Sequence, residues 1–324
     1  MKRLLKNVAI IGHGYWGQKI RKSILKNKKF RLNYIVDENK NNLVSIDKIP
    51  NYIKLISDYK NIDLRKTHGV FIATPAKSHF KIAKYFLENN INVFIEKPIT
   101  LGVKSYKILE KISNKNKKIL MAGDLYLYNP AINYIKKKIN NNLLGKIKYM
   151  EFNRLNFGIV RSDINLIENL SSHDISILYY FFKNLKIKKI QTNKQSILSY
   201  GKYDIFHANI IFSNDLKVSF KFSWCYPAKV RNLVIFGTKK NIFFDDLKPH
   251  EINISNKIIY NRNGLKKSGK NSKISLKKFF DNSPLDIEVN HFYSCLIGKN
   301  KPKSNKKLII NTLSLIEKFN KSQK

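Results

Sequence analysis

The stretch that decides the fold is I-I-G-H-G-Y-W-G, residues 10–17, where Gly12, Gly14 and Gly17 directly follow an apolar run. The whole chain has only 13 glycines in 324 residues, so this spacing needs a physical reason. G-x-G-x-x-G between a strand and a helix is typical of a loop that binds the pyrophosphate of a dinucleotide. The first glycine permits the tight turn, the second lets backbone approach phosphate, and the third lets helix pack on strand. The phosphates then meet the N–H groups and the dipole of the helix N-terminus.

An acidic residue at the end of the next strand is the expected companion of such a loop. Asp37 stands twenty residues after Gly17 and follows the run R-L-N-Y-I-V. A carboxylate there accepts hydrogen bonds from both ribose hydroxyls and repels a 2′-phosphate, and neither Glu38 nor Asn39 is an arginine that would hold that phosphate. The sequence therefore predicts NAD as the cofactor, in preference to NADP. A glycine-rich turn without a ligand is the alternative.

Strands and helices alternate through the first third of the chain, with apolar strands expected at 7–11, 31–36, 52–56, 68–73, 92–96 and 118–122. Helical spacing is found between them, at 15–27, from the stretch T-P-A-K-S-H to about Glu88, and near 102–115. This alternation predicts a parallel, doubly wound sheet of the Rossmann type, in an α/β fold. We assign residues 1–122 to an NAD(P)-binding domain of this kind.

The pattern changes after residue 123. Strands with period-two alternation predict two hairpins, one turning at Asn214-Asp215 and one within L-V-I-F-G-T-K-K-N-I-F-F. Helices are expected from Pro130 to about Asn142, from about Ser172 to Phe182, and at 307–320, with a mobile basic loop at 262–278. We assign residues 123–324 to an α+β domain with a large, mostly antiparallel sheet, whose C-terminal helix packs back on the first domain.

Two short motifs follow neighbouring parallel strands, at the edge where a doubly wound sheet binds ligands. T-P-A-K-S-H occupies 74–79 and E-K-P occupies 96–98. Lys97 is expected beside the nicotinamide, in a position that Pro98 makes rigid. Thr74 and Pro75 are candidates for lining the cofactor, with a plain strand-end turn as the alternative.

The remaining residues predicted to contact or support the cofactor lie in the same segments. His79 is expected to support its loop by hydrogen bonds, and Glu96 to orient the backbone or Lys97. Tyr15 and Trp16 lie in the glycine motif, and Trp16 is expected to pack near the cofactor or in the core. The full cofactor set is Gly12, Gly14, Tyr15, Trp16, Gly17, Asp37, Thr74, Pro75, His79, Glu96 and Lys97.

Five motifs together resemble the Gfo/Idh/MocA oxidoreductases, the glucose–fructose oxidoreductase and inositol dehydrogenase family. They are G-H-G-Y-W-G, A-T-P-A-K-S-H, E-K-P, Y-N-P (128–130) and S-H-D-I-S-I-L (172–178), in the family's order. The resemblance implies an NAD(P)-dependent dehydrogenase acting on sugars, sugar nucleotides or polyols. It also implies a homodimer or homotetramer, since the second-domain sheet often serves oligomerisation in the family. The segment around residue 173 looks like a subgroup associated with sugar-nucleotide or surface-polysaccharide metabolism.

The resemblance also implies a catalytic pair. Family members use the E-K-P lysine with a histidine in a D-x-x-x-H pattern, which here gives Lys97 and His173. Asn169 replaces the usual aspartate of that pattern and is assigned to orienting the substrate. Lysine ammonium suits an oxygen that gains negative charge, and histidine suits proton transfer near neutral pH. The alternative for His173 is a residue at a helix N-terminus with a capping role.

Further side chains are considered for the substrate pocket without being placed in the catalytic set. Tyr126 and Tyr128 could line it, and Arg154 and Arg161 are candidate partners of a diphosphate, since guanidinium binds phosphate bidentately. A different class of function stays open: a catalytically silent NAD(H)-binding regulator of the same fold.

Composition bounds the partners. The net charge is +40, and lysine-rich proteins often bind nucleic acid. Here the lysines are spread over the whole length, and no zinc-finger, RNP or basic-zipper pattern accompanies them, so we predict no nucleic-acid partner and expect only attraction of anionic ligands. No apolar stretch approaches the ~18–20 residues of a membrane helix, and we expect a cytoplasmic protein. The two cysteines and seven histidines show no metal-ligand spacing, so no metal is predicted.

Overall fold

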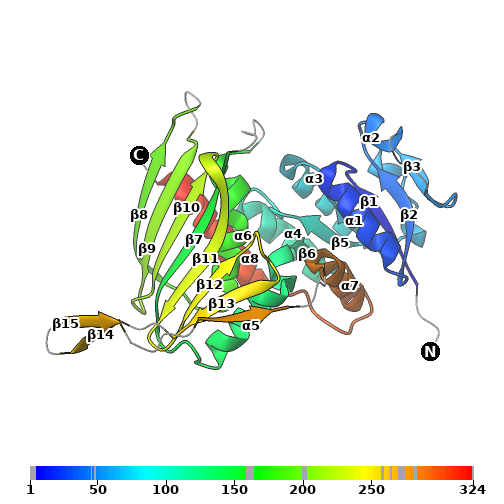
Figure 1. Cartoon of the computed structure of the whole chain (residues 1–324). Coiled ribbons are helices and arrows are strands. Elements are labelled where there is room, and N and C mark those ends of the chain that lie inside the picture. Colours follow the sequence, from blue (N-terminus) through cyan, green and yellow to red (C-terminus); the bar gives the residue numbers. More distant parts are fainter. Residues whose placement is uncertain are drawn as a thin grey trace. The chain divides into compact units, whose positions relative to one another are not determined.

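The computed structural model describes residues 5–44, 46, 49–157, 164–198, 203–256, 259–262, 265–268, 274–279 and 283–322. The chain divides into two compact units, one of Met1–Tyr128 with Asn282–Leu313 and one of Asn129–Asp281 with Ser314–Lys324 (Figure 1). The sequence analysis places a single cut at 122/123. Both units are instead discontinuous, because residues 282–313 belong to the first unit and residues 314–324 to the second.

The first unit is built on a six-stranded sheet with the order β3-β2-β1-β4-β5-β6, and every neighbouring pair in it is parallel. The strands are β1 (Lys6–Ile11), β2 (Phe30–Val36), β3 (Lys54–Ile56), β4 (Gly69–Ile72), β5 (Asn92–Glu96) and β6 (Leu120–Gly123). The predicted doubly wound sheet is confirmed. Its order reverses between β1 and β4, and at such a switch point ligands bind beyond the carboxyl ends of the strands.

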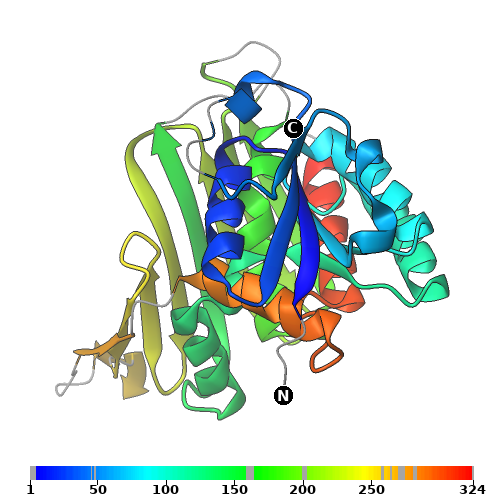
Figure 2. The same ribbon diagram turned by 90° about the vertical axis from the view of Figure 1, so that its right-hand side faces the viewer.

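Helices cover both faces of this sheet. They are α1 (Tyr15–Lys26), α2 (Asn41–Val44), α3 (Ala76–Glu88), α4 (Val103–Lys115), α7 (Pro284–Leu296) and the first part of α8 (Lys306–Lys321), with 3-10 turns η1 (Tyr59–Asn61), η2 (Leu64–Lys66) and η3 (Leu125–Tyr128). Figure 2 shows α7 lying beside α1. Asp286 of α7 fixes this pair, because it accepts hydrogen bonds from Ser23 Oγ and Lys26 Nζ, each at 2.6 Å.

Side chains along the central strands point alternately to the two faces of the sheet, and this explains why α7 packs on the first unit. One set of side chains, including Ile11, Ile72 and Ile95, is buried with α3 and with Ile309 and Leu313 of α8. The other set is aromatic. Phe71 and Phe94 point the opposite way and pack on Phe292 of α7, with ring centroids at 5.0 and 5.8 Å. Burying these rings removes apolar surface from water, which holds the late segment on the early sheet.

The second unit is built on an eight-stranded sheet with the order β16-β13-β12-β11-β7-β10-β9-β8. The strands are β7 (Ile147–Phe157), β8 (Ile187–Gln195), β9 (Ile205–Phe212), β10 (Lys217–Ser223), β11 (Cys225–Gly237), β12 (Asn241–Asp245), β13 (Glu251–Ser255) and β16 (Ile274–Lys278). Only the pair β7–β10 is parallel. The mostly antiparallel sheet is therefore confirmed, as are the two predicted hairpins, β9–β10 and β11–β12.

Two helices of this unit, α5 (Pro130–Asn140) and α6 (Leu166–Phe181), accompany the sheet (Figure 1). Asn129 caps α5 by accepting hydrogen bonds from two backbone N–H groups. The inward residues of β9 and β10 include several phenylalanines, and Phe206 and Phe220 pack on Phe319 near the end of α8, with ring centroids at 4.9 and 5.7 Å. The last part of α8 thus belongs to the core of the second unit.

Two sequence expectations in this unit are wrong. Helix α6 begins at Leu166 rather than near residue 172, because Asn165 caps it by accepting from Glu168 N–H. The segment 262–278, expected to be a mobile loop, contains β15 (Leu265–Ser268), which pairs with β14 (Ile259–Arg262), and β16, which pairs with β13. A basic composition therefore did not prevent strand pairing.

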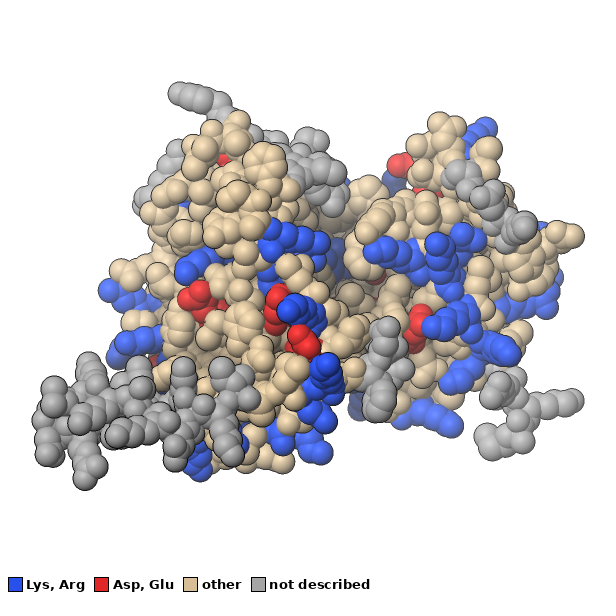
Figure 3. Space-filling view, in the orientation of Figure 1, with Lys and Arg blue, Asp and Glu red and all other residues tan. Residues whose placement is uncertain are grey.

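Basic side chains are distributed widely. On the face drawn in Figure 3, both units carry lysine and arginine side chains, and acidic side chains are fewer than basic ones. In the described part of the chain, no helix is long and apolar enough to cross a membrane.

Replacing Phe292 by alanine is expected to lower the free energy of unfolding by about 3–5 kcal/mol, because it opens a cavity among buried rings. Denaturant unfolding followed by circular dichroism measures this loss. Phe157→Ala is the matched control, since that ring is 73% exposed, and it should change stability by less than about 0.5 kcal/mol. Equal losses in the two variants would contradict the role given to α7.

Candidate cofactor and substrate site

The glycine loop is held by close backbone packing. Gly12 has a φ of +88°, and a Cβ on it would lie 2.7 Å from backbone atoms of Ala73 and Thr74. A Cβ on Gly17 would overlap the carbonyl oxygen of Gly12. Two of the three glycines are therefore required by contact between the loop, α1 and the chain after β4.

Gly14 is different, because a Cβ on it would meet nothing within 4 Å. It is the N-cap of α1, where no side chain caps the helix and no acidic residue occupies the first turn. The first N–H groups of a helix have no intrahelical acceptor, so this end can receive an anion. The open space over Gly14 is what a pyrophosphate lying against the backbone requires.

Asp37 closes the other side of the loop. Its Oδ2 accepts a hydrogen bond from the His13 N–H at 2.6 Å, and its Oδ1 accepts from the Asn39 N–H at 2.9 Å. Gly12 N–H donates to the carbonyl of Val36, so the end of β2 and the loop are joined twice. Each carboxylate oxygen has a second lone pair, which a ribose hydroxyl can use.

His13 is a member of this site that the sequence did not single out. It is 1% exposed, and its Nδ1 lies 2.9 Å from the carbonyl oxygen of Asn42. Burial lowers the pKa of His13, opposed by that hydrogen bond, so the ring is neutral at pH 7 with Nδ1 as the donor. Its Nε2 is a buried acceptor without a protein partner. The signal in the sequence was its place between two motif glycines.

Tyr15 and Trp16 begin α1 and are exposed, by 72% and 37%. Their rings meet edge to face at 6.0 Å, and Lys19 Nζ lies over both. Trp16 is thus not part of the core. These aromatic side chains lie at the surface, next to the open end of α1.

His79 joins the loops after β4 and β5. Its Nε2 lies 2.7 Å from the Thr74 carbonyl oxygen and its Nδ1 lies 2.8 Å from that of Pro98. Burial lowers the pKa of His79, opposed by these two contacts. A neutral ring donates to one of these two carbonyl oxygens, and the ring thereby lies between the turns after β4 and β5. Thr74 Oγ1 also accepts from Ser78 Oγ at 2.7 Å, which further orders this turn.

The E-K-P turn follows β5. Lys97 is half-buried, the Lys97–Pro98 peptide is cis, and Lys97 N–H donates to Glu96 Oε2 at 3.2 Å. Glu96 thus orients the backbone at Lys97. Burial raises the pKa of Glu96 to about 7, the carboxylate of Asp124 adds to this, and Lys97 opposes it. The turn lies at the same sheet edge as the glycine loop, because both follow carboxyl ends of parallel strands.

Within the second unit, α6 presents Asn169 and His173 one turn apart. Residues four apart share a helix face, and both side chains are half-buried. His173 lies in the second turn of α6, so the alternative of an N-terminal capping role is wrong.

Arg154 does not have the role considered for it. It lies on β7 and donates to both carboxylate oxygens of Asp174, from Nε at 3.0 Å and from Nη2 at 2.7 Å. Both residues are at most 5% exposed, and Asp246 Oδ2 lies 3.9 Å from Nη1. The guanidinium is thus committed to holding α6 on the sheet and is not available to a diphosphate. Arg161 lies outside the described residues.

Tyr126 and Tyr128 are buried within the first unit, at 7% and 2% exposure, which makes them parts of its interior. Among the described residues, no group of three or more His, Cys, Asp or Glu side chains is arranged to hold a metal ion.

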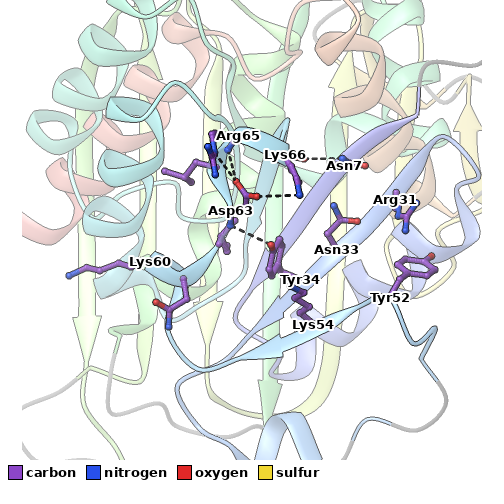
Figure 4. A pocket seen from close by; sticks show the side chains of 13 residues that line it. Asn7, Arg31, Asn33, Tyr34, Tyr52, Lys54, Lys60, Asp63, Arg65 and Lys66 are labelled. Atoms are coloured by element: carbon purple, nitrogen blue, oxygen red, sulfur yellow. Dashed lines mark hydrogen bonds and ion pairs between the residues drawn. The ribbon is translucent and has the colours of Figure 1, made fainter.

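A hollow of about 810 Å³ lies away from the predicted site (Figure 4). It is found near the amino ends of strands, beside Asn7 of β1, Arg31 of β2 and Lys54 of β3. The edge with the glycine loop is one strand length away, about 20 Å. The carboxylate of Asp63 lies 3.8 Å from Arg65 Nε and 3.9 Å from Lys66 Nζ, so it offsets part of the charge there.

Comparison with known proteins gives a family match for the first part of the chain. Residues 6–124 match the Gfo/Idh/MocA model, described as an oxidoreductase family with an NAD-binding Rossmann fold. A 2,7-anhydro-N-acetylneuraminate hydratase of Mediterraneibacter gnavus is 28% identical over 142 residues, which are 44% of this chain and 37% of that protein. A UDP-N-acetylglucosamine 3-dehydrogenase of Acidithiobacillus ferrooxidans is 30% identical over 115 residues, which are 35% of this chain and 36% of that protein. The match spans little more than a third of either relative.

The fold likeness extends further. The solved structure of the UDP-N-acetylglucosamine 3-dehydrogenase of Acidithiobacillus ferrooxidans superimposes with a TM-score of 0.83 at 18% identity, covering 97% of this chain and 96% of that one. The architecture of a parallel sheet followed by a mostly antiparallel one is therefore shared. Residues 6–124 are therefore similar to the NAD-binding Rossmann fold of the Gfo/Idh/MocA oxidoreductase family.

Proposed function

We propose that the chain is an NAD-dependent oxidoreductase that acts on a secondary alcohol or ketone of a sugar, with a sugar nucleotide as the substrate class. The observation that carries this proposal is the sheet edge of the first unit, where an open, uncapped helix end, the buried carboxylate of Asp37 and the half-buried Lys97 follow carboxyl ends of parallel strands. When bound, the nicotinamide supplies hydride transfer. The protein must bind it, orient the substrate and move one proton.

The cofactor contacts are assigned as follows. Gly12, Gly14 and Gly17 shape the pyrophosphate cradle, and Asp37 accepts from the ribose hydroxyls through lone pairs left free by His13 and Asn39. The buried, unpartnered Nε2 of His13 favours a bound group with a hydrogen-bond donor nearby. Tyr15, Trp16, Thr74, Pro75, His79 and Glu96 complete the proposed cofactor set.

Lys97 is the proposed electrostatic catalyst. Its ammonium group would stabilise the negative charge that develops on the substrate oxygen as hydride leaves the carbon. Glu96 and His79 fix its backbone, so little reorganisation is needed at the moment of reaction. His173 is assigned to accept or return the hydroxyl proton, and Asn169, one turn away, to orient the substrate.

The relatives support the substrate class. One curated relative is named for a dehydrogenase of a nucleotide-linked amino sugar and another for a hydratase of an anhydro-sugar. A cationic surface favours an anionic substrate such as a nucleoside diphosphate sugar. We also propose a cytoplasmic homodimer or homotetramer with a role in surface-polysaccharide metabolism, in line with the free thiols of Cys225 and Cys295.

Replacing Lys97 by alanine should lower kcat at least about 100-fold while NADH still binds, because the substrate oxygen loses its cationic partner. Turnover is followed at the nicotinamide absorbance band with a panel of nucleotide sugars, and binding by NADH fluorescence. Lys107→Ala on the exposed face of α4 is the control and should retain full activity. Tight NADH binding without turnover on any sugar would favour the regulatory alternative.

Replacing Asp37 by serine should reduce the preference for NAD over NADP at least about tenfold, because a carboxylate no longer repels the 2′-phosphate. Titration with NADH and NADPH, each followed by fluorescence, measures the two dissociation constants. Asp63→Ser, in the hollow at the opposite strand ends, is the matched control and should leave the ratio unchanged. A wild-type protein that prefers NADPH would contradict the assignment of Asp37.

A further inference from the structure

Two polar groups in the interior of the first unit are incompletely satisfied. Glu288 of α7 is 1% exposed, and its Oε1 makes no hydrogen bond. Tyr128 of η3 is 2% exposed, and its O–H group has no acceptor, while the backbone N–H of Lys303 acts on its oxygen. The two groups interact electrostatically, so they lie in one neighbourhood. Buried polar groups are nearly always satisfied, and an unsatisfied donor beside an unsatisfied acceptor indicates an internal water.

This neighbourhood lies against the E-K-P turn. Glu288 accepts a hydrogen bond from the backbone N–H of Asp124, which directly follows β6, and it also interacts with the carboxyl groups of Asp124 and Glu96. Glu96 ends β5 and is paired in register with Gly123. Three carboxyl groups, from β5, from the chain after β6 and from α7, therefore share one neighbourhood at the strand end from which the E-K-P turn begins.

The other titratable groups around the site are few. Lys303 Nζ lies 4.8 Å from the Tyr128 ring centroid and donates to the Leu127 carbonyl at 3.0 Å. The His291 ring lies 5.3 Å from the Tyr128 ring, and the Cys295 thiol is close enough to act on the Tyr128 hydroxyl. Burial lowers the pKa of Lys303 and of His291 and raises that of Cys295 to about 11, so His291 and Cys295 are neutral at pH 7.

The three carboxyl groups cannot all be ionised in this interior. Burial raises the pKa of Glu288 well above its usual range, and the charges on Glu96 and Asp124 raise it further. An ionised Glu288 would add a further negative charge near Glu96 and Asp124. A neutral acid there avoids this repulsion, and its O–H group can donate to an internal water.

We propose that Glu288 is a positioning residue that remains a neutral carboxylic acid, shares an internal water with the Tyr128 hydroxyl and holds the chain after β6 against the E-K-P turn. Its effect on turnover rests on the proposed function. Its protonation and its water do not, and stability measured without any substrate tests them separately.

The first experiment compares the melting temperatures of wild type and Glu288→Gln between pH 5 and pH 8. A raised pKa means that the folded state keeps a proton that the unfolded state releases, so the wild type loses stability as pH rises above about 4.3. Glutamine does not titrate, so the melting temperature of the variant relative to wild type should rise with pH. Glu96 titrates in both proteins and largely cancels. Glu88→Gln on the surface of α3 is the control, and its melting temperature relative to wild type should not change with pH. If the melting temperature of Glu288→Gln relative to wild type is also independent of pH, Glu288 is not a neutral acid in the folded state.

The second experiment is a double-mutant cycle of Glu288→Ala and Tyr128→Phe, read by melting temperature. A shared water predicts that the two losses are not additive, because either change already breaks the bridge. Additive losses would overturn the shared water.

The third experiment uses turnover, once a substrate is found. Glu288→Ala should lower kcat at least tenfold with little change in KM for NAD, and Glu288→Gln should restore most of it and move the alkaline decline of kcat to higher pH. An unchanged pH profile, or no rescue by glutamine, would overturn the positioning role. Absence of turnover in the wild type would instead count against the proposed function and would leave the first two results standing.

Discussion

Close backbone contact between the glycine loop and the chain after β4 is the constraint on which the rest of the first unit depends. Gly12 has a positive φ with no room for a side chain, and Gly17 brings α1 onto the loop itself. Because these contacts fix the start of α1 relative to the strand ends, the helix N-terminus opens at the edge of the sheet. Any larger residue at either position would push the helix away and close that edge.

The same edge is tied together by a sequence of short hydrogen bonds. His13 and Asp37 join the glycine loop to the end of β2, and His79 joins the turn after β4 to Pro98 after β5. Every loop that would contact a dinucleotide is therefore bonded to its neighbour. Loops that are already ordered lose little conformational entropy when a ligand binds. These hydrogen bonds therefore give the edge a well-ordered polar surface, although the fold itself is assembled mainly by apolar burial.

The second unit solves a different problem, that of holding one helix on a wide sheet in a fixed rotation. The bidentate pair of Arg154 and Asp174 does this from inside, because both groups are buried and joined by two hydrogen bonds. Breaking one side of such a pair leaves an uncompensated buried charge. Because Asp174 is turned to the sheet, the rotation of α6 about its axis is fixed. The direction of the helix face that carries Asn169 and His173 is thereby fixed as well.

The sequence by itself determined the features that are local. Glycine spacing, the acid that ends β2, the E-K-P turn and the period-two strands each depend on residues within about 25 positions of one another, and they gave the parallel sheet, the hairpins and the cofactor edge. Tertiary structure alone decided what joins distant segments. Arg154 looked like a phosphate ligand until Asp174 was placed beside it, and α7 returns to the first unit because Phe292 fills a gap left by rings on β4 and β5. Burial and electrostatics act through space, so no pattern along the chain could show that Glu288 lies next to Glu96.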